Sequence, residues 1–308
     1  MKFLSRWCWL AFGLHSSALS CAHRELPPET QVKSVRSPKG QELQPFEPIE
    51  KEAQILSPLC LHGCPELLEK RENQLIRREI YLLSNNKLTK LADWVAYRVT
   101  KTTIGKSKRR NWKADPDIAE ADTLEPEDYR GANRVLRTDR GHQVPLASFS
   151  GTKQWRQLNY MSNISPQKGK LNQQIWKRLE QRVRKLAREP EVEAVYVITG
   201  PLFEREMPPL PGANESHEVP SGYFKVVAIT EGESLRVAAF IMDQETPGSD
   251  SHCDYGVTVH EVESRAQLDF FVALPDAREG LLESRKGDLY FRLGCEMSPE
   301  SSAAPQAD

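Results

Sequence analysis

Runs of β-branched and aromatic residues dominate the middle of this 308-residue chain. Five runs have the length and composition of strands, and they lie at residues 80–83, 94–99, 195–199, 223–229 and 237–242. Residues 172–188 instead place apolar side chains at helical spacing, and Pro190 follows to end the helix that this spacing predicts. Because the strands follow one another with few helices between them, the pattern favours an α+β fold on a central antiparallel sheet.

The ends of the chain lack this patterning. Residues 21–55 are rich in Pro, Glu, Lys and Gln and have few apolar positions, which predicts a flexible tether. Residues 296–308 have a similar composition and predict a disordered tail. We therefore expect one folded domain at residues 56–295, a length that a single domain can have.

Residues 1–20 have the composition of a signal peptide. Lys2 and Arg6 precede a short apolar stretch that ends in small residues, so cleavage before Cys21 is expected to release an exported protein. The segment also resembles a bacterial lipobox, with Ala18 where that motif usually has Leu, which makes Cys21 a candidate lipidation site. The protein is thus expected to be a periplasmic, outer-membrane or cell-surface lipoprotein, or alternatively to be secreted.

Composition excludes two broad classes of protein. No apolar run reaches the roughly 18–20 residues of a membrane-spanning helix, which excludes an integral membrane protein. The formal net charge of −1 excludes a globally basic nucleic-acid binder, but a local basic patch is compatible with it. The sequence also lacks a complete P-loop and the Gly-x-Ser-x-Gly elbow of esterases.

The cysteines need individual interpretation, because export permits disulfides. Cys60 and Cys64 are close enough in sequence to close a short loop, and Cys253 and Cys295 lie near the C-terminus. Zinc binding is the competing use, although a Cys-x3-Cys pair with no second pair nearby is a poor zinc pattern. Cys21 is the odd thiol that remains after export.

Two polar segments carry candidate chemistry before the helix. The first is a basic run that ends in Arg110-Asn111-Trp112-Lys113, which is either a phosphate-contacting loop or a solvated charged loop. The second is Asp139-Arg140-Gly141-His142. In an extended backbone the side chains of Arg140 and His142 point to the same face. A base, His142, and an anion-binding group, Arg140, would then lie close together.

The predicted helix carries the third candidate segment. Asn172, Trp176, Glu180 and Arg184 recur every four residues and form one stripe. The plain interpretation is a capping Asn, a core Trp and a surface ion pair. Taken with the basic run and His142, however, the stripe supplies the oxygen ligand, carboxylate and cations that metal-assisted phosphodiester hydrolysis requires.

These segments together resemble the DNA/RNA non-specific endonuclease family. The resemblance rests on Asp-Arg-Gly-His at residues 139–142 followed by Asn-x3-Trp-x3-Glu-x3-Arg at residues 172–184, and it extends over residues 58–295. It implies a ββα-metal (His-Me finger) fold with a central antiparallel sheet and flanking helices. It also implies two disulfides, Cys60–Cys64 and Cys253–Cys295.

The resemblance further implies roles for individual residues. His142 would be the general base that deprotonates water, and Asn172 would be the only direct protein ligand of Mg²⁺, for which Mn²⁺ would substitute. Glu180 would hold metal-bound water. Arg110, Arg140 and Arg184 would bind the substrate phosphate and stabilise its charge in the transition state, and Asn163, grouped with them at the phosphate, would help fix the site.

The implied activity is hydrolysis of DNA and RNA to 5′-phosphorylated oligonucleotides. A water nucleophile needs no 2′-hydroxyl, and phosphate contacts carry no sequence information, so neither sugar nor sequence preference is expected. The expected partners are DNA, RNA, a membrane through lipidated Cys21, and a second copy of the chain in a homodimer. The alternatives are a catalytically weak exported nucleic-acid-binding protein acting in DNA uptake, and a phosphodiesterase for small substrates.

Overall fold

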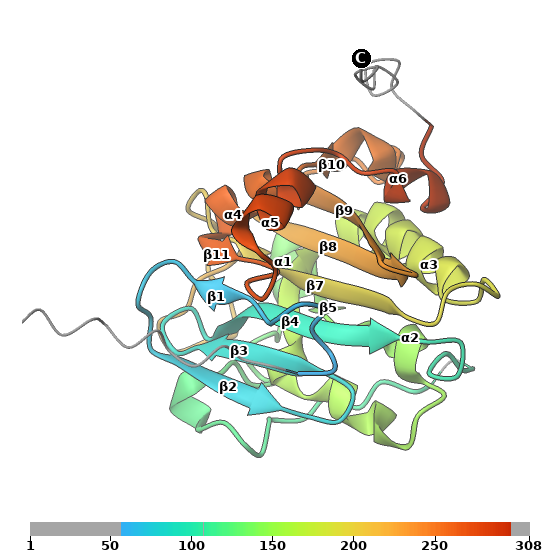
Figure 1. The fold of residues 1–308 in the computed structure, drawn as a ribbon. Coiled ribbons are helices and arrows are strands. Elements are labelled where there is room, and N and C mark those ends of the chain that lie inside the picture. The colour runs from blue at the N-terminus through green and yellow to red at the C-terminus, as the bar shows by residue number, and fades with distance from the viewer. Residues whose placement is uncertain (1–56, 107, 297–308) are drawn as a thin grey trace, which may run out of the picture. The chain divides into compact units, whose positions relative to one another are not determined.

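A computed structural model describes residues 57–106 and 108–296. Within these residues the chain forms an antiparallel sheet of seven strands in the order β10-β9-β8-β7-β4-β3-β2, which lie side by side in Figure 1. The strands are β2 (Asn73–Arg77), β3 (Leu82–Asn86), β4 (Leu91–Val99), β7 (Val195–Leu202), β8 (Gly222–Glu231), β9 (Ser234–Asp243) and β10 (Gly256–Val257). All five predicted strands overlap this sheet, although Ile80 and Tyr81 precede the first residue of β3.

Both faces of the sheet are buried, which explains why its strands read as continuous apolar runs. On β8, Tyr223 and Val227 pack into the hydrophobic cluster of one face, while Phe224 and Val226 pack into the cluster of the other. Alternate side chains point to opposite faces, so burial on both sides removes the polar positions that a one-sided sheet would show.

Different helices cover the two faces. Helix α3 (Lys177–Leu186) contributes to the cluster that contains Tyr223, and α4 (Val259–Ala266) contributes to the opposite one. Shorter elements complete the domain: β1 (Glu66–Leu67), α1 (Ala132–Leu136), α2 (Leu146–Phe149), β11 (Leu268–Asp269), α5 (Asp276–Glu283), α6 (Leu289–Arg292), and 3-10 turns at Glu120–Asp122, Lys153–Asn159, Met161–Asn163 and His252–Tyr255. This arrangement is the α+β fold with flanking helices that the sequence predicts.

A separate two-stranded hairpin precedes α3. Strand β5 (Thr138–His142) pairs antiparallel with β6 (Ile164–Lys168), and the chain then enters a π-helical turn, Leu171–Trp176, that runs directly into α3. The sequence predicts a regular helix from residue 172, so the π turn is a departure from that prediction. Trp176 lies in the core at 1% exposure, with its ring centroid 5.9 Å from that of Tyr223, as the plain interpretation of the helix expects.

Both implied disulfides are present. Cys60 is bonded to Cys64 and Cys253 to Cys295, with Cα atoms 5.0 and 5.4 Å apart. The zinc alternative for these four cysteines is therefore wrong, because their thiols are consumed in the two bonds. The signal peptide, the tether, Cys21 and nearly all of the predicted tail fall outside the described residues. No helix among the described residues is long and apolar enough to cross a membrane.

The two disulfides are expected to contribute unequally to stability. Cys253–Cys295 closes a loop of sequence separation 42, and Cys60–Cys64 one of separation 4. Chain entropy therefore predicts that replacing the long pair by Ser lowers the free energy of unfolding by about 4 kcal/mol, against about 2 kcal/mol for the short pair. Urea denaturation of the two double-Ser variants measures this, and a larger loss from the short pair would contradict it.

Candidate active site

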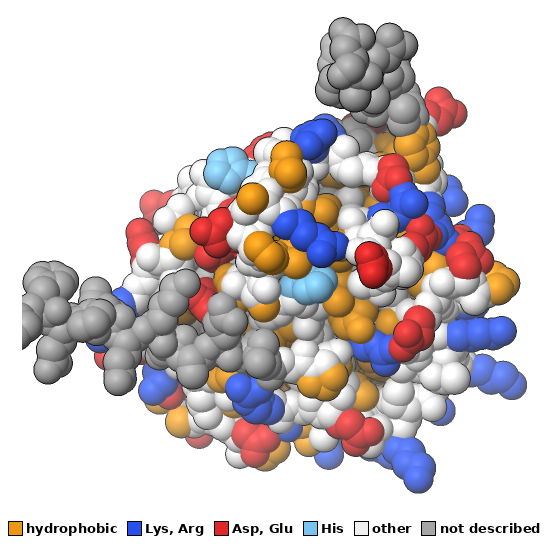
Figure 2. Space-filling model, viewed as in Figure 1, with side chains coloured by type: hydrophobic (Ala, Val, Ile, Leu, Met, Phe, Trp, Pro, Cys, Tyr) orange, Lys and Arg blue, Asp and Glu red, His pale blue; other side chains and the backbone are white. Residues whose placement is uncertain are grey.

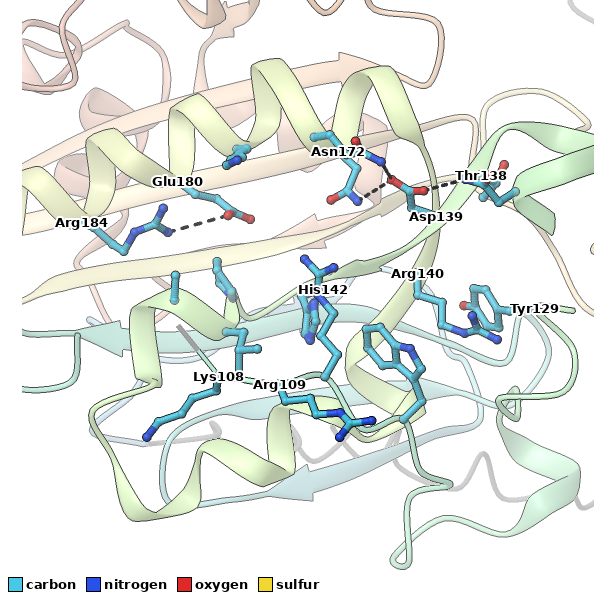
Figure 3. A pocket seen from close by; sticks show the side chains of 18 residues that line it. Lys108, Arg109, Tyr129, Thr138, Asp139, Arg140, His142, Asn172, Glu180 and Arg184 are labelled. Carbon is cyan, nitrogen blue, oxygen red and sulfur yellow. Dashed lines mark hydrogen bonds and ion pairs between the residues drawn. The ribbon is translucent and has the colours of Figure 1, made fainter. Parts of the chain in front are cut away.

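A cleft of about 1060 Å³ opens where the β5–β6 hairpin meets the helix and a basic loop. One wall is formed by the π turn and α3, which contribute Asn172 and Glu180, and the opposite wall carries Lys108 and Arg109 (Figure 3). Figure 3 places His142 between these walls. Six of the residues predicted from the sequence line this cleft: Arg110, Arg140, His142, Asn172, Glu180 and Arg184.

His142 is the last residue of β5 and is paired with Ile164 of β6. The centroid of its ring lies 5.1 Å from that of Trp112, with the planes tilted by 40°. Its Nε2 atom is buried and has no hydrogen-bond partner among the described residues. A ring nitrogen that lines a cleft and has no protein partner can take a proton from a molecule bound there.

Gly141 lets the hairpin close tightly beside His142. A Cβ atom at position 141 would lie 2.5 Å from Oε1 of Gln167 and 2.8 Å from its Cβ, which is closer than side chains pack. The glycine is therefore required by close approach of β6. Gly141 has the backbone conformation of an ordinary strand residue, so glycine is not required there for a left-handed backbone conformation.

Asn163, which is grouped with the phosphate-binding residues and expected to help fix the site, does not line the cleft. Its side chain is fully buried. Its Oδ1 accepts a hydrogen bond from the backbone N–H of Val144 at 2.8 Å, and its Nδ2 donates to the carbonyl oxygens of Val144 and Leu158 at 3.2 and 2.9 Å. These contacts use both amide N–H groups and hold the segment that follows His142, so they support the role of fixing the site rather than direct contact with phosphate.

The surroundings of His142 favour its neutral form. Burial, together with the charge of Arg110, lowers its pKa from 6.5 to about 3, although the side chain of Asn159 opposes the fall. The proton-accepting form is therefore the stable one at neutral pH. Because an unfolded His titrates near pH 6.5 while the folded one does not, this residue should make the free energy of unfolding fall as the pH drops from 6.5 toward 3.

Replacing Arg110 by Ala is expected to raise the pKa of His142, because a nearby positive charge is removed. NMR titration of the ring in metal-free protein measures this shift. Arg109→Ala is the matched control, since Arg109 also lines the cleft but has no such influence on His142. A wild-type His142 that titrates near pH 6.5, or an equal shift in both variants, would contradict the electrostatic role of Arg110.

Asp139 orients Asn172. The Oδ2 atom of Asp139 accepts hydrogen bonds from Nδ2 of Asn172 at 3.0 Å and from Nε2 of Gln173 at 2.7 Å, and its Oδ1 accepts from Asn133 at 2.9 Å. The amide nitrogen of Asn172 is thereby used, which leaves its carbonyl oxygen for the cleft. The sequence motif contains Asp139, but nothing in the sequence alone indicates this contact.

Glu180 and Arg184 form a mostly buried pair on α3. The closest guanidinium nitrogen of Arg184 lies 3.8 Å from Oε2 of Glu180, and it also donates to Ser148 Oγ at 3.5 Å. Burial raises the pKa of Glu180, while the charges of Lys225, Arg184 and Lys177 act to lower it. Burial and the neighbouring cations thus act on this pKa in opposite directions, and the effect of burial is the larger.

The remaining cations are positioned for an anionic ligand. Arg140 is held by a hydrogen bond from its Nη2 to the Pro126 carbonyl at 2.7 Å, and its guanidinium lies 5.4 Å from the Tyr129 ring and 5.9 Å from the Trp112 ring. Arg110 is exposed and makes no ion pair within the described part of the chain. By contrast, the face over α4 and α5 mixes acidic and basic side chains (Figure 2), so it offers no comparable concentration of positive charge.

Sequence reasoning missed several residues around the site. Trp112 belongs to the basic segment that the sequence indicates, but its contacts with the ring of His142 and the guanidinium of Arg140 were not predicted. Buried Asn159 neighbours His142 and does not stand out from its sequence context. Lys225 and Tyr97 lie beneath α3. Only Lys225 carries a signal that could have been used, since it is a charged residue in the middle of an apolar strand.

Comparison with known proteins identifies the class that this fold and cleft define. The family model for DNA/RNA non-specific endonucleases matches residues 65–277. The chain is 47% identical over 237 residues to a nuclease of Serratia marcescens, covering 77% of this chain and 88% of that protein. It is also 29% identical to nuclease C1 of Cunninghamella echinulata var. echinulata over 247 residues, which are 72% of this chain and 90% of that protein.

A solved structure agrees with the fold. A chain in a crystal structure of the EndoG/EndoGI complex superposes with a TM-score of 0.59 at 24% identity, covering 70% of this chain and 90% of that one. The antiparallel sheet with its hairpin and helix is thus the ββα-metal nuclease fold. The chain belongs to the DNA/RNA non-specific endonuclease family, and it is a hydrolase that cleaves nucleic acids.

Proposed function

We propose that this protein is a Mg²⁺-dependent, sugar-non-specific endonuclease that hydrolyses DNA and RNA to 5′-phosphorylated oligonucleotides, with His142 as general base. The observation that carries the proposal is the buried, unpartnered Nε2 of His142 in the same cleft as Asn172, Glu180 and three arginines. A base, hard oxygen ligands and cations are the parts that this hydrolysis requires.

The residues present fit a magnesium ion. Asp139 fixes the carboxamide of Asn172 so that its Oδ1 is free, and Glu180 adds a carboxylate to the same cleft. Oxygen ligands of this kind suit Mg²⁺, which keeps most of its waters and takes few protein ligands, and Mn²⁺ accepts similar ligands. When bound, the ion would neutralise charge that develops on the phosphate and on the leaving 3′-oxygen, with Asn172 as direct ligand and Glu180 accepting from its hydration shell.

The protein's own residues perform the remaining tasks. His142 takes the proton from water as the water oxygen attacks phosphorus. The bond from phosphorus to the 3′-oxygen breaks, the 3′-oxygen takes a proton from solvent to become a hydroxyl, and the phosphate remains on the 5′ side. Arg110, Arg140 and Arg184 bind the non-bridging oxygens and stabilise their charge. These groups address phosphate and not bases, which supports cleavage without sequence preference.

A plasmid-nicking assay tests the proposal. Supercoiled DNA and a folded RNA should both be cut by the purified protein in Mg²⁺, and EDTA should stop both reactions until Mg²⁺ is restored. Binding of DNA without cleavage would instead favour the exported binding protein for DNA uptake. Cleavage of a small phosphodiester but not of plasmid would favour the small-substrate enzyme.

We also propose that the protein is exported and anchored through lipidated Cys21. The two disulfides fit an oxidising compartment. They use four of the six cysteines, and removal of the signal peptide would remove Cys8, so Cys21 would be the free thiol of the mature protein. A coil of 35 residues spans roughly 30–35 Å, which would hold the domain clear of a lipid surface. The homodimer expected from the family stays a prediction that sedimentation velocity tests.

Replacing Cys21 by Ser is expected to move the protein from the membrane fraction to the soluble fraction without changing its activity. The physical reason is that acyl chains on this thiol would supply the membrane affinity. Intact-mass measurement of the mature wild-type protein checks the premise. A chain that starts at Cys21 but carries no acyl mass would exclude the anchor and leave a secreted enzyme.

A further inference from the structure

A second hollow, of about 570 Å³, adjoins the active-site cleft. The two cavities meet at Tyr129, Asn133 and Arg140, which line both of them. In Figure 3, Arg140 and Tyr129 lie at the opposite end of the cleft from Arg184. The second hollow therefore extends the cleft beyond the residues that carry the proposed reaction.

The boundary between the two cavities is held in place by contacts within the fold. The side chain of Tyr129 is buried, and its hydroxyl donates to the carbonyl oxygen of Ile164 on β6 at 3.3 Å. The guanidinium of Arg140 lies 5.4 Å from the Tyr129 ring and donates to the Pro126 carbonyl at 2.7 Å. Because this boundary is already positioned, a ligand that spans it has little side-chain ordering to offset.

Two further arginines line the second hollow. Arg130 precedes α1 and Arg134 lies on it, and both side chains are exposed. Among the described residues neither side chain forms an ion pair or a hydrogen bond. The described lining of this hollow contains one acid, Glu127, so three guanidinium groups face one carboxylate. This excess of positive charge favours the binding of an anion there.

A nucleic-acid strand would bring such an anion to the second hollow. Phosphates follow one another along a strand, so a strand whose scissile phosphate lies between His142 and Arg140 carries further phosphates out past an end of the cleft. Past Arg140, the strand reaches the hollow that Arg130 and Arg134 line. The planar guanidinium group matches the geometry of phosphate oxygens, which it can bind with two hydrogen bonds.

We propose that the second hollow is an accessory subsite for a phosphate that flanks the scissile one, bound by Arg130 and Arg134. This inference rests on the proposed function, which places the scissile phosphate in the cleft beside Arg140. Arg130 and Arg134 contact the strand but not the reacting atoms. They bind it equally before and during cleavage, so they set the affinity for a polymeric substrate and not the rate of bond breaking.

Equilibrium binding tests the subsite without cleavage. In the His142→Ala background and in EDTA, the double change Arg130→Gln and Arg134→Gln should weaken binding of a short single-stranded DNA about tenfold at low ionic strength. The slope of log affinity against log salt concentration should also become shallower, by about 0.7 for each phosphate contact that is lost. An unchanged affinity or an unchanged slope would overturn the proposal.

Two single variants locate the effect. Arg137→Gln removes an exposed arginine that directly follows α1 but lines neither cavity, so it should change the affinity by less than about twofold. Glu127→Gln removes the acid of the second hollow and should strengthen binding about twofold or more. A loss in Arg137→Gln equal to that of the double variant would show only attraction to a basic surface, and it would overturn the subsite. Binding that Glu127→Gln does not strengthen would do the same.

Steady-state cleavage separates affinity from chemistry. With His142 intact, the double variant should raise KM for the same DNA in Mg²⁺ about tenfold and leave kcat within about twofold, as the loss of uniform binding does. A lower kcat at unchanged KM would assign the two arginines to the reaction or to the fold, and it would overturn their role in a flanking subsite.

Failure of the two hypotheses is distinguishable. A wild-type protein that binds but never cleaves DNA would contradict the proposed function, while the binding measurements in EDTA would still test the second hollow. A wild-type protein that cleaves normally, together with a double variant that binds and cleaves DNA as the wild type does, would reject only the accessory subsite.

Discussion

Replacing His142 by Ala is expected to lower turnover by about 10²–10⁴-fold, the usual effect of removing a positioned general base. The reason is that Nε2 of His142 is a buried ring nitrogen of the cleft with no protein partner, and its pKa lies well below neutrality, so it is ready to accept a proton. Steady-state cleavage of plasmid in Mg²⁺ measures the loss.

The fold should survive this change. His142 is only partly buried and contacts one aromatic ring, that of Trp112, while the segment after it is fixed independently by Asn163. Thermal unfolding of His142→Ala should therefore remain cooperative, with a melting temperature close to that of the wild type. A folded variant within tenfold of wild-type activity would remove His142 from the role of base.

Replacing Asn172 by Ala is expected to raise the Mg²⁺ concentration needed for half-maximal activity by at least about tenfold, since even indirect metal partners have effects of that size. Activity measured against Mg²⁺ concentration gives this shift. Gln173→Ala is the matched control, because Gln173 donates to the same Oδ2 of Asp139 but has no proposed contact with the ion. Unchanged metal dependence in Asn172→Ala, or an equal shift in the control, would contradict the ligand assignment.

The central strands could be predicted because burial on both faces makes them continuous apolar runs. The β5–β6 hairpin could not, since its strands contain Asp139, Arg140 and Pro166 and carry no apolar pattern. Tertiary hydrogen bonds stabilise it instead. The carbonyl of Pro166 accepts from the hydroxyl of Tyr223 at 2.6 Å and from Nε2 of Gln244 at 2.7 Å, and neither partner is near in sequence.

That His142 and Asn172 lie in one cleft was predictable from their motif. A residue's role was not predictable where it depends on what the side chain touches. Asn163 could donate to a phosphate oxygen, yet both of its amide N–H groups donate to backbone carbonyls. The core position of Trp176 was predictable from its place on the apolar side of the helix, but the π turn at Leu171–Trp176 was not.

The central claim is that water, and not a hydroxyl of the substrate, attacks phosphorus in both DNA and RNA. Matched DNA and RNA oligonucleotides can be digested in Mg²⁺ and ¹⁸O-labelled water, and the ends of the products analysed by mass spectrometry. We expect one ¹⁸O atom in the 5′-phosphate formed by a single cleavage of either polymer, opposite an unlabelled 3′-hydroxyl. RNA fragments that end in a 2′,3′-cyclic phosphate or a 3′-phosphate, or 5′-phosphates without label, would contradict the account.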